Sequence, residues 1–247
     1  WWYWYRWYTG STERLRIDSS GNVGIGTASP SSYDSASDDL VIAGTGNRGM
    51  TIISATDSNS TIAFGDGTGS AGYQGMVAYL NANNAMTFRT TAIERMRIDS
   101  TGAVTMPSQP AFHVASNSSQ ANVSVNTEHV VNFASEVFDV GSDFASNYFT
   151  APVTGKYLLT TNARIDDFDA DANFYQLRLT TSNRTCYSLI DPDVGKDTNY
   201  RHLSLSVLTD MDANDTAYVG FFQSGGGAQT DIDGDAKYTN FSGYLAC

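Results

Sequence analysis

The sequence has few of the features from which helical or membrane-spanning proteins are built. Leu, Lys and Glu are scarce among its 247 residues, and no window keeps an apolar period of 3.6 residues for three turns. No run of about 18 apolar residues occurs, so no membrane span is expected. Gly, Ser, Thr and Asn are abundant, together with 14 Tyr and 12 Phe. Short alternating runs separated by turn residues therefore predict an all-β protein.

Cysteine and histidine are also rare. Cys186 and Cys247 cannot make a disulfide framework, so two free thiols are expected, with a single bridge as the alternative. His113, His129 and His202 each stand on an expected strand among apolar neighbours, and no histidine pair has metalloprotease spacing. The sequence predicts no catalytic residues and no enzyme. Paired carboxylates at glycosidase separation are left open, because acidic residues are abundant.

Basic residues are few, and the excess of acidic over basic residues differs between the two parts of the chain. The chain carries 14 basic and 26 acidic residues, a formal net charge of −12. Residues 1–108 hold seven basic and nine acidic residues, whereas residues 109–247 hold seven and seventeen. So acidic a surface repels phosphate backbones, and no nucleic-acid partner is expected. It suits divalent cations or basic partners.

One stretch occurs twice. Residues 13–26 read ERLRIDSSGNVGIG and residues 94–107 read ERMRIDSTGAVTMP, at a constant offset of 81 residues. The pattern predicts a short strand, a tight turn made by Asp, Ser and Gly, and a returning strand. A repeat of this kind usually marks a modular, extended architecture. The eight identical pairs are Glu13/Glu94, Arg14/Arg95, Arg16/Arg97, Ile17/Ile98, Asp18/Asp99, Ser19/Ser100, Gly21/Gly102 and Val23/Val104.

The residues before and between the two copies are expected to form short strands. At the same offset, Trp7 of the aromatic stretch WWYWYRWY falls on Phe88, which favours a strand there; an aromatic membrane anchor is the alternative. Such strands are too thinly apolar to bury a core within one chain, and they become stable when chains stack and share a core. The five strands expected between the copies span residues 40–43, 50–54, 61–64, 75–80 and 85–89.

Pro107 and Pro110 mark the boundary between a shaft domain, 1–107, and a head domain, 108–247. In the head, longer and more aromatic strands predict a sandwich or jelly roll. They are expected at 111–115, 123–125, 129–137, just before Phe149, and at 156–165, 174–180, 185–190, 201–209, 217–223 and 238–246. Six aromatic residues on these strands should fill its core: Phe133, Phe149, Tyr157, Phe174, Phe221 and Phe241.

The head's aspartates cluster in three loops that consecutive antiparallel strands would bring to one end, away from the shaft. They are expected to form a ligand-binding tip, and oxygen ligands on flexible loops suit calcium, the only cofactor predicted. A solvated acidic surface is the alternative. The expected ligand-binding residues are Asp166, Asp167, Asp169, Asp171, Asp191, Asp193 and Asp197. The expected calcium ligands are Asp231, Asp233 and Asp235.

Two resemblances add to these patterns. The motif E-R-[LM]-R-I-D-S-[ST]-G-x-V resembles the repeated element of bacteriophage tail-fibre and adhesin shafts, which implies a trimeric fibre. The head resembles the globular domain of complement C1q and its tumour-necrosis-factor-like relatives, which implies a ten-stranded jelly-roll trimer that binds diverse ligands and is not an enzyme. The residues that carry it are Ala111–Val114, Val131, Phe133, Phe138, Asp139, Gly141, Phe144, Phe149, Pro152, Gly155, Tyr157 and Phe241–Leu245. No collagen Gly-X-Y repeat precedes this head.

Together these features predict the distal tail-fibre protein of a bacteriophage. The expected homotrimer would sit in the virion, outside the host cell, and would contact other tail or fibre proteins. Its tip would bind a host surface receptor, glycan or protein. The main alternative is a structural cap that nucleates trimerisation without recognising anything. A glycan-degrading spike enzyme has the least support.

Overall fold

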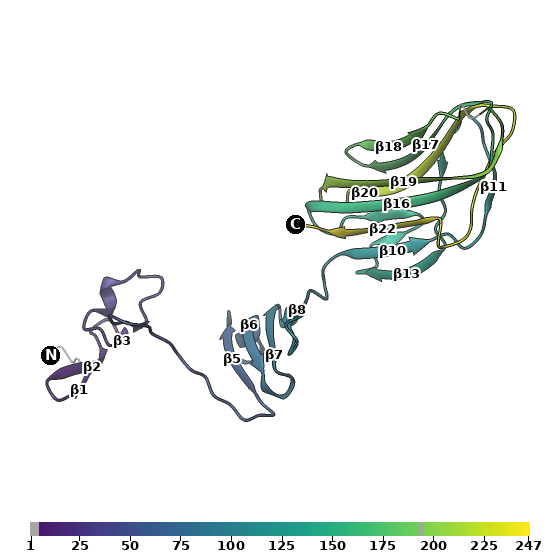
Figure 1. Ribbon diagram of the computed structural model, residues 1–247. Helices are drawn as coiled ribbons and strands as arrows, with labels where there is room; N and C mark the ends of the chain where they lie inside the picture. The colour runs from purple at the N-terminus through teal and green to yellow at the C-terminus, as the bar shows by residue number, and fades with distance from the viewer. Residues whose placement is uncertain (1–4, 193–194) are drawn as a thin grey trace. The chain divides into compact units, whose positions relative to one another are not determined.

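The computed structural model describes residues 5–192 and 195–247 and is built almost entirely of β-strands (Figure 1). The all-β prediction is therefore confirmed. Among the described residues, no helix has the length and the apolar surface that crossing a membrane requires. The chain divides into two compact units, and the division falls between Met86 and Thr87, inside strand β7 (Ala85–Thr90).

The first unit holds two small groups of strands. One is a sheet in the order β1-β2-β3-β4, in which β4 runs parallel to β3 and the other pairs are antiparallel. The other is the antiparallel pair β5 and β6. The bounds are β1 Tyr5–Thr9, β2 Thr12–Ile17, β3 Val23–Ile25, β4 Leu40–Ile42, β5 Asn59–Phe64 and β6 Gly75–Leu80, with 3-10 turns at Pro30–Ser32, Gly69–Tyr73 and Asn81–Asn83.

The predicted strand at 50–54 is wrong. This segment is rich in β-branched residues, yet it forms no strand. A strand needs a hydrogen-bonded neighbour, and none of the described strands pairs with it. Propensity alone therefore does not make a strand here.

The two copies of the repeated motif fold alike. β2 and β8 (Ile93–Ile98) lie 81 residues apart, and each is followed by a tight turn and a short returning strand, β3 in the first copy and β9 (Val104–Thr105) in the second. In both turns an Asp carboxylate accepts two backbone N–H groups, and a Gly adopts a positive φ, 93° at Gly21 and 88° at Gly102. This left-handed geometry favours glycine. In both copies an Arg Nε also donates to a Glu Oε1 at 2.7 Å, Arg16 to Glu13 and Arg97 to Glu94.

From Ala111 onward the second unit is a sandwich of two antiparallel sheets (Figure 1). Its strands are β10 Ala111–Ala115, β11 Gln120–Val123, β12 His129–Val130, β13 Ser135–Val140, β14 Phe144–Ala145, β15 Tyr148–Thr150, β16 Gly155–Phe168, β17 Ala172–Thr181, β18 Thr185–Ile190, β19 Thr198–Met211, β20 Thr216–Gly225, β21 Thr230–Ile232 and β22 Asn240–Leu245. In the β16 sheet, β16 pairs with β19 on one side and with β22 and β21 on the other, and β10 and β13 follow β22. The β20 sheet has the order β14-β15-β20-β17-β18, and β12 also pairs with β20.

A single hydrophobic core lies between these sheets. Phe112 is at its centre, with its ring centroid 4.6 Å from that of Phe149 and 4.9 Å from that of Phe241. Five of the six predicted core aromatics are buried in it. The exception is Phe174, which stacks on Phe222 on the outer face of the β20 sheet. Its neighbour Tyr175 is the buried one, because the strand register lies one residue away from the expected register.

The strands at 111–115 and 185–190 were predicted with their observed bounds. β16 and β19 are longer than expected, at 14 residues each. The strand predicted at 129–137 is broken into β12 and β13, and β21 lies inside an expected loop. Cys186 and Cys247 are free thiols, as favoured.

Candidate functional site

Three loops meet at one end of the sandwich, as the strand order predicts. The backbone N–H of Ala170, after β16, donates to Asp197 Oδ1, before β19, at 2.9 Å. The backbone N–H of Ala228, after β20, donates to Asp169 Oδ2 at 2.8 Å. The chain enters the sandwich at the other end, where Ala111 pairs with Tyr244. The acidic loops therefore form the end of the sandwich away from the entering chain.

Asp169 is an internal anchor of this end and not an exposed ligand. Its carboxylate is 5% exposed and accepts N–H groups from Ala228 at 2.8 Å and Asp171 at 2.8 Å. These hydrogen bonds, that from Ala228 first, hold the pKa of Asp169 below its ordinary value. A side chain at Gly226 would place its Cβ 2.4 Å from Asp169 Oδ2, so only glycine lets this loop close over the carboxylate.

Asp166 and Asp233 share one arginine. Arg164 Nε donates to Asp166 Oδ1 at 2.8 Å, and Arg164 Nη2 donates to Asp166 Oδ2 at 3.0 Å and also to Asp233 Oδ2. The guanidinium carbon lies 4.6 Å from the ring centroid of Tyr238 and 5.8 Å from that of Tyr200. The carboxylates raise the pKa of Arg164 above its ordinary value, so the guanidinium is always charged. The sequence pattern gave no reason to single out Arg164.

The three predicted calcium ligands have different partners. Asp231 Oδ1 accepts the backbone N–H of Asn122 at 2.6 Å, and Asp233 is held by Arg164. Asp235 Oδ1 accepts the backbone N–H of Lys237 at 2.9 Å. In residues 5–192 and 195–247, no three Asp, Glu, His or Cys side chains are arranged to hold a metal ion. Calcium binding stays a prediction.

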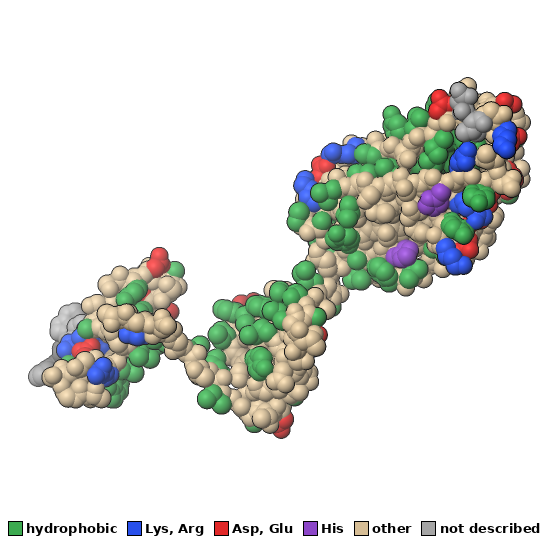
Figure 2. All heavy atoms as spheres, in the orientation of Figure 1, with side chains coloured by type: hydrophobic (Ala, Val, Ile, Leu, Met, Phe, Trp, Pro, Cys, Tyr) green, Lys and Arg blue, Asp and Glu red, His purple; other side chains and the backbone are tan. Residues whose placement is uncertain are grey.

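The other candidate aspartates lie at the surface. Asp167 has a positive φ of 53°, and Asp171, Asp191 and Asp197 are exposed. Asp193 lies outside the described residues. Figure 2 shows charged side chains at both ends of the sandwich and few on the face between them. These exposed carboxylates are the part of the tip that can meet a partner.

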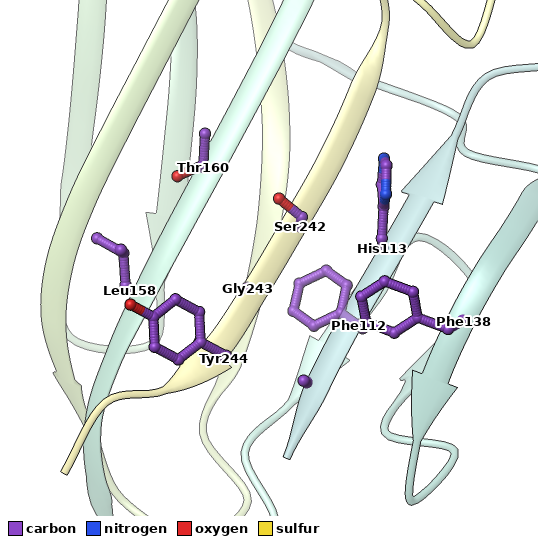
Figure 3. Close-up of a pocket in the computed structure, with 9 residues that line it drawn as sticks. Phe112, His113, Phe138, Leu158, Thr160, Ser242, Gly243 and Tyr244 are labelled. Atoms are coloured by element: carbon purple, nitrogen blue, oxygen red, sulfur yellow. The ribbon is translucent and has the colours of Figure 1, made fainter. Parts of the chain in front are cut away.

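A broad uncharged face lies beside the charged end, on the outside of the β16 sheet. Along one row of the register, Leu208, Leu158 and Tyr244 lie opposite one another, and the next row holds Ser206, Thr160 and Ser242. The hydroxyls of Thr160 and Ser206 lie 2.9 Å apart and satisfy each other. A shallow hollow of about 400 Å³ opens on this face and includes these residues on β16 and β22 (Figure 3).

Residues 111–246 match the family model of the C1q domain. The chain belongs to the C1q family. C1q and tumour-necrosis-factor-like domains are typically homotrimeric. No curated protein matches the chain significantly. Among solved structures, three similar ones are the globular domain of zebrafish complement 1qA protein (18% identity, 56% of this chain and 98% of that chain, TM-score 0.40), murine APRIL (11%, 56% and 98%, 0.42) and Eiger TNF from S. frugiperda (14%, 56% and 94%, 0.43).

The resemblance of the head to C1q is thus confirmed, and its marker residues have structural roles. Phe112, Phe149, Tyr157 and Phe241 are buried in the jelly-roll core. Gly155 leaves room for the chain end, because a Cβ there would lie 2.8 Å from the carbonyl oxygen of Cys247. These residues hold the C1q fold together.

Proposed function

We propose that this chain is the distal part of a bacteriophage tail fibre, whose C1q domain forms a homotrimeric tip that binds a host cell-surface receptor. The protein would act in the virion, outside the host cell, by binding and not by catalysis. The observation that carries the proposal is the duplicated hairpin followed by a C1q domain with no collagen stalk between them.

The hairpins support a shaft because they are alike in structure as well as in sequence. Residues 13 and 16 form the same ion pair as residues 94 and 97, and both turns have the same backbone hydrogen bonds, such as that from the Gly21 N–H to the Asp18 carbonyl at 3.1 Å. A module that recurs with the same geometry is typical of repetitive, extended proteins.

The uncharged face of the β16 sheet is the surface on which we place the contacts between C1q domains. Leu208 and Tyr244 are exposed there, and they flank the half-buried Leu158. Several polar groups of the next rows bond to one another, as Thr160 does to Ser206 at 2.9 Å and Asn162 to Asn240 at 3.1 Å, which lowers the cost of covering them. An uncharged face whose polar groups are largely paired suits another copy of itself.

The proposed receptor-binding tip is the acidic end of the domain, because it lies away from the entering chain and exposes Asp167, Asp171, Asp191 and Asp197. The test is competition: purified full-length chain should block adsorption of the phage that carries it. The variant Asp167→Asn/Asp171→Asn/Asp191→Asn/Asp197→Asn should block less well. The matched control is Asp210→Asn/Asp212→Asn/Asp215→Asn, which removes carboxylates at the opposite end.

Each failure has a different meaning. A trimeric chain that never blocks adsorption is a structural cap. If both variants block adsorption equally well, the recognition site lies outside the acidic loops. Release of oligosaccharide from host envelope material would identify an enzyme and overturn the proposal.

A further inference from the structure

One face of the sheet β1-β2-β3-β4 is apolar except at one end, where Thr9 lies opposite Thr12 and accepts a hydrogen bond from Arg14 Nε. The register sets Trp7 opposite Leu15 and Leu15 opposite Ile25, and directly opposed residues share a face. The parallel partner β4 continues the same face with two more apolar residues. We call this surface the shaft face. Its eight residues are Tyr5, Trp7, Leu15, Ile17, Val23, Ile25, Leu40 and Ile42.

The opposite face of the sheet is polar or already covered. The register shifts between Trp7 and Tyr8, and this bulge sets Glu13 opposite Tyr8 and so away from the shaft face. There Glu13 Oε1 accepts from Arg16 Nε at 2.7 Å. Towards β4 the same side is closed by Pro30, which is buried over Gly24. One face of the sheet is therefore covered or internally hydrogen-bonded, whereas the apolar shaft face is open to solvent.

The shaft face leaves large apolar side chains exposed to solvent. Tyr5 is 61% exposed, Leu40 53% and Trp7 50%. A small sheet needs a packed apolar face for stability in water, and a contiguous exposed apolar patch marks an association surface. The shaft face therefore has the exposure expected of an association surface.

The second motif repeats this surface. Phe88, Val104 and Met106 correspond to Trp7, Val23 and Ile25 at the offset of 81, and all three are exposed. The half-buried Met96 and Ile98 stand where Leu15 and Ile17 stand, and Ile98 lies opposite Val104. A surface that recurs with its exposure pattern implies a partner that recurs with it.

We propose that the shaft face is covered by the same face of two other copies of this chain, so that three sheets enclose one apolar core. The second motif builds an equivalent core one period later. The occupant follows from the C1q domain on the same chain: because such domains are typically homotrimeric, three copies of each shaft face are tethered in one assembly. The eight residues of the shaft face carry no charge, so three copies can meet over them without burying an ion. This inference rests on the proposed homotrimer but not on the receptor.

The test compares two neighbouring residues of β1. Trp7 and Tyr8 are 50% and 51% exposed in one chain but lie on opposite faces. Each is replaced by Cys in the full-length chain carrying Cys186→Ser and Cys247→Ser. With Trp7→Cys, a polar maleimide should react at least about tenfold more slowly than with Tyr8→Cys, because a buried thiol reacts only after local opening.

Met106→Cys and Thr105→Cys repeat the comparison in the second motif. They replace the Trp7 and Tyr8 variants if substitution at Trp7 prevents folding. Equal reactivity on both faces of a chain that light scattering shows to be a trimer would overturn the inference. Protection of Trp7→Cys that appears only with vesicles of phosphatidylcholine and phosphatidylglycerol would overturn it in favour of a lipid surface. A protected face in a trimer that does not block adsorption would uphold it and reject only the receptor.

Discussion

The two units of this molecule are both β-structure, but only one is complete as a single chain. From Ala111 on, the C1q domain encloses one cluster of buried aromatic and aliphatic side chains. In the described residues up to Met86, the buried hydrophobic residues besides Pro30 are only Val41, Ala78, Leu80 and Ala85. A domain that buries so little apolar surface cannot offset its loss of conformational entropy. We therefore expect the first unit to need partners to fold, whereas the C1q domain encloses its own core.

The largest expected effect comes from removing a buried side chain from the core of the C1q domain. Phe149→Ala should lower the free energy of unfolding of the head by about 3–5 kcal/mol, because its ring is fully buried between the sheets. The measurement is chemical denaturation of the full-length trimer. The control is Tyr187→Ala, which removes an aromatic residue that is 56% exposed. A small effect at Phe149 would contradict the packing described above.

The second prediction asks whether the tip of the trimer binds calcium. Calcium bound only by the folded trimer would stabilise each site by about 2.7 kcal/mol at a hundredfold excess over its dissociation constant. Thermal melting with calcium against chelator should show a shift in the parent and none in Asp231→Asn/Asp233→Asn/Asp235→Asn. Asp210→Asn/Asp212→Asn/Asp215→Asn should keep the shift. No shift in the parent would leave the tip an acidic surface that awaits a basic partner.

The smallest expected effect contrasts a buried carboxylate of the tip loops with a carboxylate in the second copy of the repeated turn. Asp169→Asn should destabilise the protein by about 1–3 kcal/mol, because buried N–H groups of the tip loops lose a charged acceptor. Asp99→Asn in the exposed shaft turn should cost less, since water can replace its contacts. Denaturation of both variants against the parent checks this order, and equal losses would show that the tip loops do not depend on Asp169.

The Asp169 carboxylate also predicts that the stability of the protein depends on pH. The pKa of Asp169 is lowered from its ordinary value of 3.8, chiefly by the hydrogen bond from the Ala228 N–H. A lowered pKa in the folded state means that the carboxylate contributes its stability in full above about pH 4 and loses it as the pH falls further. Unfolding curves of Asp169→Asn and the parent should therefore converge in acid. Curves that stay equally far apart would assign the effect to packing.

Much of this architecture follows from the sequence, because it rests on local patterns. Alternation of apolar and polar residues predicted the strands of the C1q domain, and their antiparallel order brought three loops to one end. The Asp-Ser-x-Gly spacing predicted both shaft turns, since carboxylate, backbone and glycine all lie within five residues. Features that depend on residues close together in the sequence can therefore be predicted from the sequence.

Other features depended on contacts between distant residues. Asp169 is buried because Ala228, 59 residues away, donates to it, and Arg164 joins Asp233 across 69 residues. A one-residue change of register moved Tyr175 into the core and Phe174 out of it, because successive side chains of a strand point to opposite faces. The bulge beside Trp7 likewise decides that Glu13 leaves the shaft face apolar. Composition and spacing determine which strands can form, but register and long-range hydrogen bonds decide which side chains remain at the surface to bind.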